Sequence, residues 1–316
     1  MEGHDFTAID MEKPLQNVDS DFFKLASKII KKRLDNIGLT DTDTESFFPE
    51  NPEFTLGMIK CRESLKIEAM EKYPQGTPKQ INDHVYKYAR AKYYSDRLKS
   101  KANLPPYSGF EMITSISSGI IRNLLDPCYW MYDAVLSENN LNPTKLIPYS
   151  IQNRIIVDRS KKLWSLLEEG LDKLIEDCSE SQAKKVSQLF KNLMILFRAR
   201  LLNHKSEPRA ITFTISQITT HDLVFNKIQP LLDIARKAQL LYTRISRSKD
   251  DGKLETYYVP NRLLFPSYGL DPNGQHARVS IKVTDLWNAT DKNIQIPISN
   301  DDNYQSDGQQ SINYAQ

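Results

Sequence analysis

The chain has 316 residues, a length that fits two domains or one large domain. Its 42 basic and 40 acidic residues give a formal net charge of +2, so a nucleic-acid-binding surface would have to be a local basic patch. Hydrophobic residues make up 40% of the chain and charged residues 26%, which is typical of a soluble protein with a substantial core.

Compartment and membrane association are predicted from what the sequence lacks. The N-terminal segment has no apolar signal core, and no uninterrupted apolar run is long enough to cross a bilayer. The three cysteines, Cys61, Cys128 and Cys178, are far apart and form no CxxC pair, so we expect neither disulfides nor zinc. We therefore predict a cytoplasmic protein with no membrane partner.

The N-terminal half is predicted to be helical. Phe22, Leu25, Ile29 and Ile30 recur at helical spacing after Asp19 or Ser20, either of which is a plausible N-cap. Gly38 is a natural stop for this helix. Further helices are expected over 55–73, 80–101, 108–136, 150–178 and 181–203, with a loop over 39–53 and with Pro127 dividing the 108–136 helix.

The sequence pattern changes after residue 209. β-Branched residues predict a strand over 210–215, which is followed by a helix over 222–240 and by strands over 242–246 and 255–259. Asp251-Gly252 between the last two strands is a strong hairpin signal. Residues 261–276 are expected to form a loop, and 278–283 a closing strand. Helix, strand, helix and hairpin is the order of a winged helix.

The resulting fold class is mainly α. We expect a helical domain over residues 1–145 and a winged-helix domain over 146–287. Residues 288–316 are rich in Asn, Asp, Gln and Ser, and they are expected to form a mostly disordered tail. The alternating Ile294, Ile296 and Ile298 are the exception, because they would suit a short strand added to the body.

Two basic segments are candidates for binding nucleic acid. The hairpin carries Arg244, Arg247, Lys249 and Lys253, which would contact DNA phosphates if the module binds DNA, and which would otherwise be solvated or serve protein docking. The second segment, residues 86–101, interleaves lysines and arginines with tyrosines. It fits either nucleic-acid stacking or an amphipathic helix that buries its rings and solvates its lysines.

The segment Ser117-Ser118-Gly119-Ile120-Ile121-Arg122 places one arginine in an otherwise apolar stretch. An arginine in such a place needs a partner, because burying its charge alone is very costly. Two hypotheses remain open at this stage. Arg122 either forms an internal ion pair with a carboxylate or contacts a nucleotide phosphate, which its planar fork suits.

Ser108-Gly109-Phe110 and the segment ending at Arg122 resemble the lid helix of AAA+ ATPases of the origin-recognition (ORC) type. Asn261-Arg262-Leu263-Leu264-Phe265-Pro266, Gly269-Leu270 and Gly274-Gln275-His276-Ala277-Arg278 resemble the C-terminal signature of bacterial ORC-like ATPases. The resemblance also takes in the first helix, from Phe22 to Leu34. It implies a lid-like helical domain in which Arg122, with Ser118 and Gly119, is the residue that senses the γ-phosphate.

The chain departs from this family in the nucleotide-binding core. Family members carry a phosphate loop and acidic metal-binding motifs before the lid, and this sequence has no GxxxxGK[ST] motif. The resemblance therefore implies a non-catalytic C-terminal half, with ATP and Mg²⁺ bound only when a separate AAA+ core chain or oligomer partner completes the site. Double-stranded DNA is a possible further partner. The alternative is a stand-alone winged-helix DNA-binding regulator whose helical half dimerises.

Overall fold

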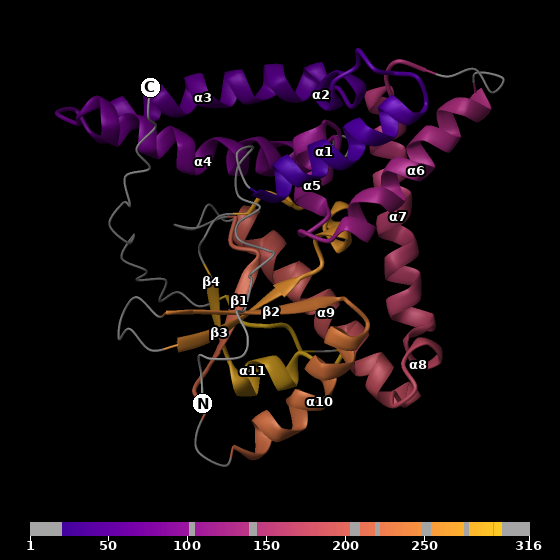
Figure 1. Cartoon of the computed structure of the whole chain (residues 1–316). Helices are drawn as coiled ribbons and strands as arrows, with labels where there is room; N and C mark the ends of the chain where they lie inside the picture. The colour runs from indigo at the N-terminus through magenta and orange to yellow at the C-terminus, as the bar shows by residue number, and fades with distance from the viewer. Residues whose placement is uncertain are drawn as a thin grey trace, which may run out of the picture.

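The computed structural model describes residues 21–100, 105–138, 144–202, 209–218, 222–247, 254–274, 278–292 and 294–298. The expected N-caps Asp19 and Ser20 lie outside these residues. The chain is mainly helical and has one small four-stranded sheet, which confirms the predicted fold class at this level (Figure 1).

Helices make up the chain before its first described strand. They are α1 (Asp21–Asn36), α2 (Thr44–Phe47), α3 (Pro52–Lys72), α4 (Pro78–Lys99), α5 (Phe110–Ile116), α6 (Ile121–Glu138), α7 (Tyr149–Glu169), α8 (Leu171–Leu174) and α9 (Glu180–Leu202). The predicted bounds of α3, α4 and α9 are confirmed to within three residues. Their regular spacing of apolar residues made these helices predictable.

Side-chain caps fix where α3 and α4 begin. The Asn51 side chain accepts a hydrogen bond from the Glu53 N–H, and Thr77 forms a reciprocal capping box with Gln80. A proline at the first position of each helix suits the start, because it lacks an N–H that would have no partner there. The two helices form a hairpin in which α3 lies at the outer edge of the molecule and α4 on its inner side (Figure 1).

Three predicted boundaries in the helical half are wrong. The expected loop over 39–53 contains α2, which Asp43 caps by accepting hydrogen bonds from Ser46. The expected helix over 150–178 is interrupted at Gly170, between α7 and α8. The expected 108–136 helix is interrupted at residues 117–120, and Pro127 lies inside a continuous α6.

The second half contains the sheet. Its elements are β1 (Thr212–Ser216), α10 (Leu223–Lys237), β2 (Leu241–Arg247), β3 (Leu254–Pro260), the 3₁₀ turns η1 (Arg262–Leu264) and η2 (Pro266–Tyr268), β4 (Arg278–Lys282) and α11 (Val283–Asn288). The strand order is β2-β3-β1-β4, with β1 antiparallel to β3 and parallel to β4. The predicted order of helix, strand, helix and hairpin is confirmed.

The segment between β3 and β4 is not the surface loop that its prolines and glycines predicted. Leu264 and Phe265 are fully buried, and Arg262, Leu270 and Asp271 are nearly so. Trp164 of α7 donates its indole N–H to the Leu264 carbonyl at 3.0 Å. The segment therefore packs as part of the core, between the helical half and the sheet.

The ordered body also extends beyond the expected end at residue 287. Ala289 and Ile296 are buried, and the Asn192 amide donates to the carbonyls of Ala289 and Ile294 at 2.7 and 3.0 Å. The expectation of a mostly disordered tail from residue 288 is therefore wrong for residues 288–292 and 294–298. Residues 299–316 lie outside the described residues.

We expect Ile296→Ala to lower the free energy of unfolding by about 2 kcal/mol or more, because it empties a buried site. Ile294→Ala is the matched control, since Ile294 is 43% exposed and its removal leaves no comparable cavity. Urea unfolding of the two variants measures the difference. Equal stability of the two variants would show that the segment does not dock on the body.

One hydrophobic cluster joins the two halves. It includes buried residues from α1 to α6 and continues through α7, α9, the sheet and α11. The buried side chains on either side of the predicted 145/146 boundary therefore belong to the same core, and the boundary itself stays a prediction.

Candidate functional site

The turn between α5 and α6 is built from the residues that resemble a lid motif. Ser118 and Gly119 both adopt positive φ angles, 55° and 81°, and this reverses the chain after α5. Ser117 is fully buried and donates its hydroxyl to the Thr114 carbonyl at 2.6 Å. Two successive residues thus adopt the left-handed backbone conformation, which favours glycine. This ends α5 and lets α6 start in a new direction.

This turn contacts the second block of the resemblance. The Ser118 hydroxyl accepts a hydrogen bond from the Arg262 backbone N–H at 3.2 Å, and the Arg262 guanidinium donates to the Ser115 carbonyl at 3.4 Å. Asn261, next to Arg262, donates from its side chain to the Gln239 carbonyl at the start of β2. Two sequence blocks separated by more than 140 residues therefore form one junction.

Arg122 lies beside this junction on the surface. It is the second residue of α6, its side chain is exposed, and it has no ion pair within the part of the chain that the structure describes. The next carboxylate along the helix, Asp126, pairs instead with Arg159 of α7 at 2.7 Å. The hypothesis that Arg122 is half of a buried internal ion pair is therefore wrong.

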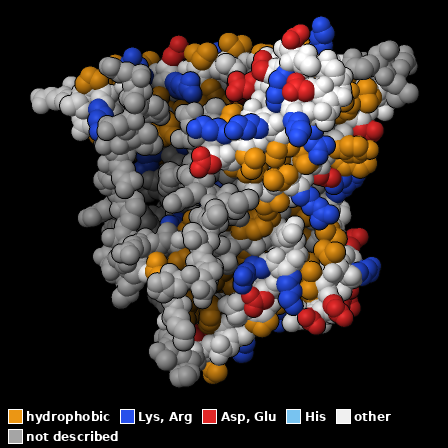
Figure 2. All heavy atoms as spheres, viewed as in Figure 1, with side chains coloured by type: hydrophobic (Ala, Val, Ile, Leu, Met, Phe, Trp, Pro, Cys, Tyr) orange, Lys and Arg blue, Asp and Glu red, His pale blue; other side chains and the backbone are white. Residues whose placement is uncertain are grey.

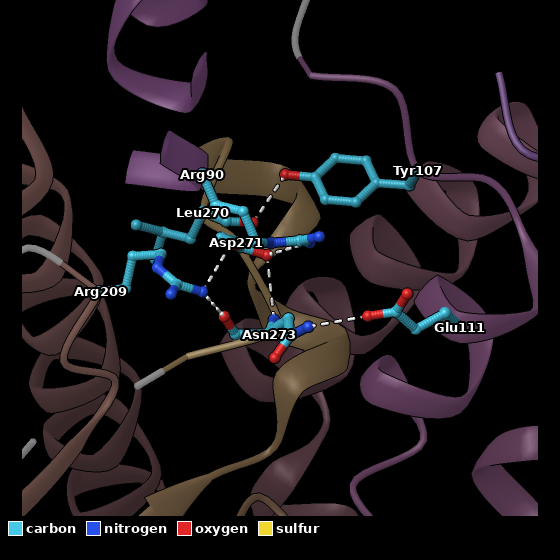
Figure 3. A network of polar contacts seen from close by, with 7 residues as sticks. All are labelled: Arg90, Tyr107, Glu111, Arg209, Leu270, Asp271 and Asn273. Atoms are coloured by element: carbon cyan, nitrogen blue, oxygen red, sulfur yellow. Dashed lines mark hydrogen bonds and ion pairs between the residues drawn. The ribbon is translucent and has the colours of Figure 1, made fainter. Parts of the chain in front are cut away.

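A buried ionic cluster that the sequence does not predict lies between α4, α5 and the segment before β4 (Figure 3). Arg90 of α4 binds the Asp271 carboxylate through two hydrogen bonds of 2.8 and 2.9 Å, and Arg209 approaches the same carboxylate at 3.5 Å. Asn273 donates its backbone N–H to Asp271 and its side-chain amide to Glu111 of α5, both at 3.0 Å. The cluster thus joins α4, α5 and the segment before β4.

The charges of this cluster depend on each other. Burial alone would raise the pKa of Asp271, but the charge and hydrogen bonds of Arg90 outweigh it and the pKa is lowered. Burial alone would lower the pKa of Arg90, yet Asp271 raises it well above its ordinary value. Arg209 is farther from the carboxylate, so burial prevails there and its pKa is lowered. The directions of the Asp271 and Arg90 shifts both favour the charged forms, so this pair acts as a structural clamp.

Few features of the sequence point to this cluster. The basic segment over 86–101 was interpreted either as a nucleic-acid surface or as an amphipathic helix. The structure agrees with the second interpretation at Tyr93 and Tyr94, which are buried, and at Lys99, which is exposed, whereas Tyr86 is 75% exposed. Arg90 of this segment faces inward, toward Asp271. The only usable signal was that Asp271 lies in a Pro- and Gly-rich stretch that resembles a family signature.

Of the four hairpin cations, the structure describes the side chain of one. Arg244 is half-buried in β2 and lies opposite Tyr257 of β3, and the backbone of Arg247 ends β2 opposite Leu254. Lys249 and Lys253 lie outside the described residues. The hairpin itself is confirmed, and its contact with DNA stays a prediction.

The cysteines are poorly suited to nucleophilic chemistry. All three are buried, and burial raises each thiol pKa, that of Cys128 to about 12. Among the described residues, no group of three or more His, Cys, Asp or Glu side chains is arranged to hold a metal ion. No described helix is both long and apolar enough to cross a membrane.

The fold and the junction define a mainly helical protein in which a small sheet joins a helical body through a buried turn. A family model described as ORC-CDC6-like matches residues 58–281, and the chain therefore belongs to the ORC-CDC6-like family. The matched region contains the Ser117–Arg122 turn, η1 and the buried ionic cluster. Membership is consistent with a protein of the ORC/Cdc6 AAA+ type. No curated protein and no solved structure matches the chain.

Proposed function

We propose that this chain is a non-catalytic part of an ORC-type AAA+ ATPase, and that it acts by placing Arg122 at the nucleotide site of a separate core chain. The observation that carries the proposal is the position of Arg122. Its side chain is exposed, and it follows a turn that Ser118 fixes to η1 by a hydrogen bond. An arginine whose backbone is held in place and whose guanidinium is exposed is suited to contact a phosphate.

The surroundings of Arg122 support a positioning role for the turn. Ile116 and Leu124, on either side of it, are buried in the core, so the first turn of α6 has little freedom to shift. Gly119 and Ser118 set the direction in which α6 leaves the turn. Because the backbone at Arg122 is held, only its side chain has to be ordered when a nucleotide arrives.

We propose that ATP and Mg²⁺ bind only when a partner core supplies a phosphate loop and acidic metal ligands. ATP with Mg²⁺ would supply the transferable γ-phosphate. This chain would contribute Arg122 toward that phosphate and the rigid turn that carries it. The same proposal places the protein in the cytoplasm, with an AAA+ core chain or oligomer as its partner.

The purified chain is expected to hydrolyse ATP no faster than background, because phosphoryl transfer depends on groups that its sequence does not contain. The measurement is phosphate release by the full chain, alone and mixed with a separate AAA+ core chain that carries a phosphate loop. We expect turnover only in the mixture and an increase when this chain is added to the core. Robust turnover by the chain alone, surviving further purification, would contradict the proposal.

The second half of the chain has the element order of a winged helix, and we propose that this module binds double-stranded DNA through its hairpin. In the observed sheet, β3 lies between β1 and β2, so β2 is an edge strand. Ile245 and Leu254, near the tip of the hairpin, are also exposed. An edge strand whose hairpin sequence carries several cations is suited to contact with a phosphate backbone.

Neutralising Arg247 and Lys249 together is expected to weaken DNA binding and to reduce the slope of log affinity against log salt by about two, if each makes one phosphate contact. Titration of a DNA duplex at several salt concentrations measures the slope. The exposed pair Lys161 and Lys162 on α7, replaced in the same way, is the matched control. An unchanged slope in the hairpin variant would show that the hairpin does not touch phosphate.

The runner-up function is a stand-alone winged-helix DNA-binding regulator whose helical half dimerises. One observation favours it, namely an exposed apolar stripe on α3, which lies in the helical half. An experiment can distinguish the two functions, because only the ATPase-subunit function requires a nucleotide-binding partner.

A further inference from the structure

The outer helix α3 is apolar on two opposite faces. Its inner face buries Phe54, Met58, Cys61, Leu65 and Ala69 against the core, mainly through α4. Gly57 lets the two helices approach closely, because a Cβ there would stand 2.4 Å from the ring of Tyr93. One face of α3 is thus fully used by the fold.

The opposite face of α3 carries a second apolar stripe. Leu56, Ile59, Ile67 and Met70 are 59%, 44%, 62% and 48% exposed. At 100° per residue these four, with Glu63, fall within a sector of about 80°. Figure 2 shows hydrophobic side chains along this outer edge of the molecule. Four large apolar side chains in one row on a surface helix mark an interaction site.

The stripe is symmetric about Glu63. Ile59 and Ile67 lie four residues before and after it, and Leu56 and Met70 lie seven residues before and after it. If a second, identical helix ran antiparallel across this face, Leu56 would meet Met70 of the other copy and Ile59 would meet Ile67. A surface that complements itself under a two-fold rotation is what a symmetric dimer requires.

We propose that the outer face of α3 is a homodimer interface in which two copies of the chain pair antiparallel, with the two-fold axis at Glu63. The inference is independent of the proposed function, because it uses neither the Arg122 turn nor the hairpin. Figure 1 places α3 at the edge of the molecule, with α4 on its inner side, so that its outer face is open to a second copy.

The charges beside the stripe are compatible with this pairing. The two Glu63 side chains would approach each other at the axis, which is unfavourable if they stand alone. Lys60 and Lys66 lie three residues before and after Glu63, which is within reach on a helix. In the dimer, four lysines would surround two glutamates, so the centre would not carry an uncompensated negative charge.

The dimensions predict a concentration-dependent dimer. α3 has 21 residues and is therefore about 30 Å long. One helix pair with four apolar side chains from each copy forms an interface at the small end of those that associate stably. We therefore expect monomer at low concentration and dimer at higher concentration.

Sedimentation equilibrium of the full chain across a wide concentration range tests the proposal. Ile67→Glu is expected to weaken dimerisation by at least about tenfold, since it replaces a buried apolar contact with a charge at the interface. Ser64→Glu adds the same charge to the same helix, about 100° away from the centre of the stripe, and is expected to change the dissociation constant far less. Circular dichroism of both variants verifies that the fold is retained.

Cysteine cross-linking tests the antiparallel register. Glu63→Cys is expected to form a disulfide between copies, because the two positions meet at the axis. Leu56→Cys is expected not to do so alone, since its two copies would lie about 21 Å apart, but it should cross-link when mixed with Met70→Cys. The unaltered chain is the background control, because its own cysteines are buried. A monomer at every concentration, a dimer indifferent to Ile67→Glu, or self-cross-linking of Leu56→Cys would each overturn the proposal.

Discussion

Asp271→Ala is expected to lower the free energy of unfolding by about 3–5 kcal/mol, the usual cost of removing one partner from a buried ion pair. The wild-type carboxylate accepts two hydrogen bonds from Arg90 and lies 3.5 Å from Arg209. Its removal leaves two guanidinium groups facing each other in the interior without the charge that holds them. Urea unfolding followed by circular dichroism measures the loss.

A matched control distinguishes the effect of losing a buried ion pair from the effect of losing an exposed one. Glu138 pairs with Arg154 at 2.8 Å, but both side chains are 53% exposed. Glu138→Ala is therefore expected to cost less than about 1 kcal/mol. If the two alanine variants lost equal stability, the buried cluster would not be the clamp that its geometry indicates.

A double variant adds a second check on the same cluster. Asp271→Ala combined with Arg90→Met is expected to be more stable than the sum of the single losses predicts, because the methionine removes one of the stranded charges. Losses that simply add would show that Arg90 and Asp271 do not act as a pair.

The stability of the unaltered protein at acid pH should also depend on this cluster. The pKa of Asp271 is lowered in the folded state, so its stabilising contribution is fully present above the ordinary carboxyl pKa of 3.8. It is lost as the pH falls below that value and through the lower pKa of the folded state. Asp271→Ala should flatten this acid limb of the stability curve, and an unchanged limb would mean that another carboxylate governs it.

Regular spacing made most helices predictable, whereas local conformation and long-range contacts did not follow from it. The stripe Phe54, Met58, Cys61 and Leu65 has a clear helical period, and α3 ends within one residue of its predicted end. The 108–136 stretch is apolar almost throughout, so its period does not reveal the turn at Ser118 and Gly119. Only the positive φ angles of these residues show that the chain reverses there.

The ionic cluster lay beyond sequence reasoning for a different reason. Arg90 and Asp271 are separated by 181 residues, and each lies in a segment whose composition is typical of the surface. Only the folded chain brings them together, and only burial distinguishes Arg90 from the solvated cations near it in α4.

Arg122 is recognisable in the sequence as a candidate functional residue, because it interrupts an apolar stretch next to Gly119. The sequence left two hypotheses of equal weight for it, an internal ion pair and a contact with nucleotide. The side chain is exposed and has no ion pair among the described residues, which removes the first hypothesis. The second hypothesis stays a proposal.

The proposed pairing of α3 bears on the choice between the two functions. A stable homodimer would present two hairpins related by a two-fold axis, as a regulator of palindromic DNA requires. Dimerisation without any nucleotide-binding partner would therefore favour the stand-alone DNA-binding regulator. Dimerisation of the assembled ATPase would be compatible with both.

The second large effect is expected for Arg122→Ala in the reconstituted ATPase. If Arg122 contacts the γ-phosphate, its removal should lower ATP turnover by about 10²–10³-fold, the range found when a single group that stabilises transition-state charge is lost. The isolated chain should lose less than about 0.5 kcal/mol of stability, because the side chain is exposed and unpaired among the described residues. Arg122→Lys should recover little activity, since an ammonium lacks the planar fork of arginine.

The decisive measurement is the ATP turnover of the core bound to this chain, compared between wild type and Arg122→Ala at equal occupancy. Co-sedimentation of chain and core verifies that both variants bind, and thermal unfolding verifies that both are folded. If Arg122 contacts the γ-phosphate, turnover falls by two orders of magnitude or more in the variant while binding and melting temperature stay unchanged. Normal turnover in a fully bound Arg122→Ala complex would contradict this contact.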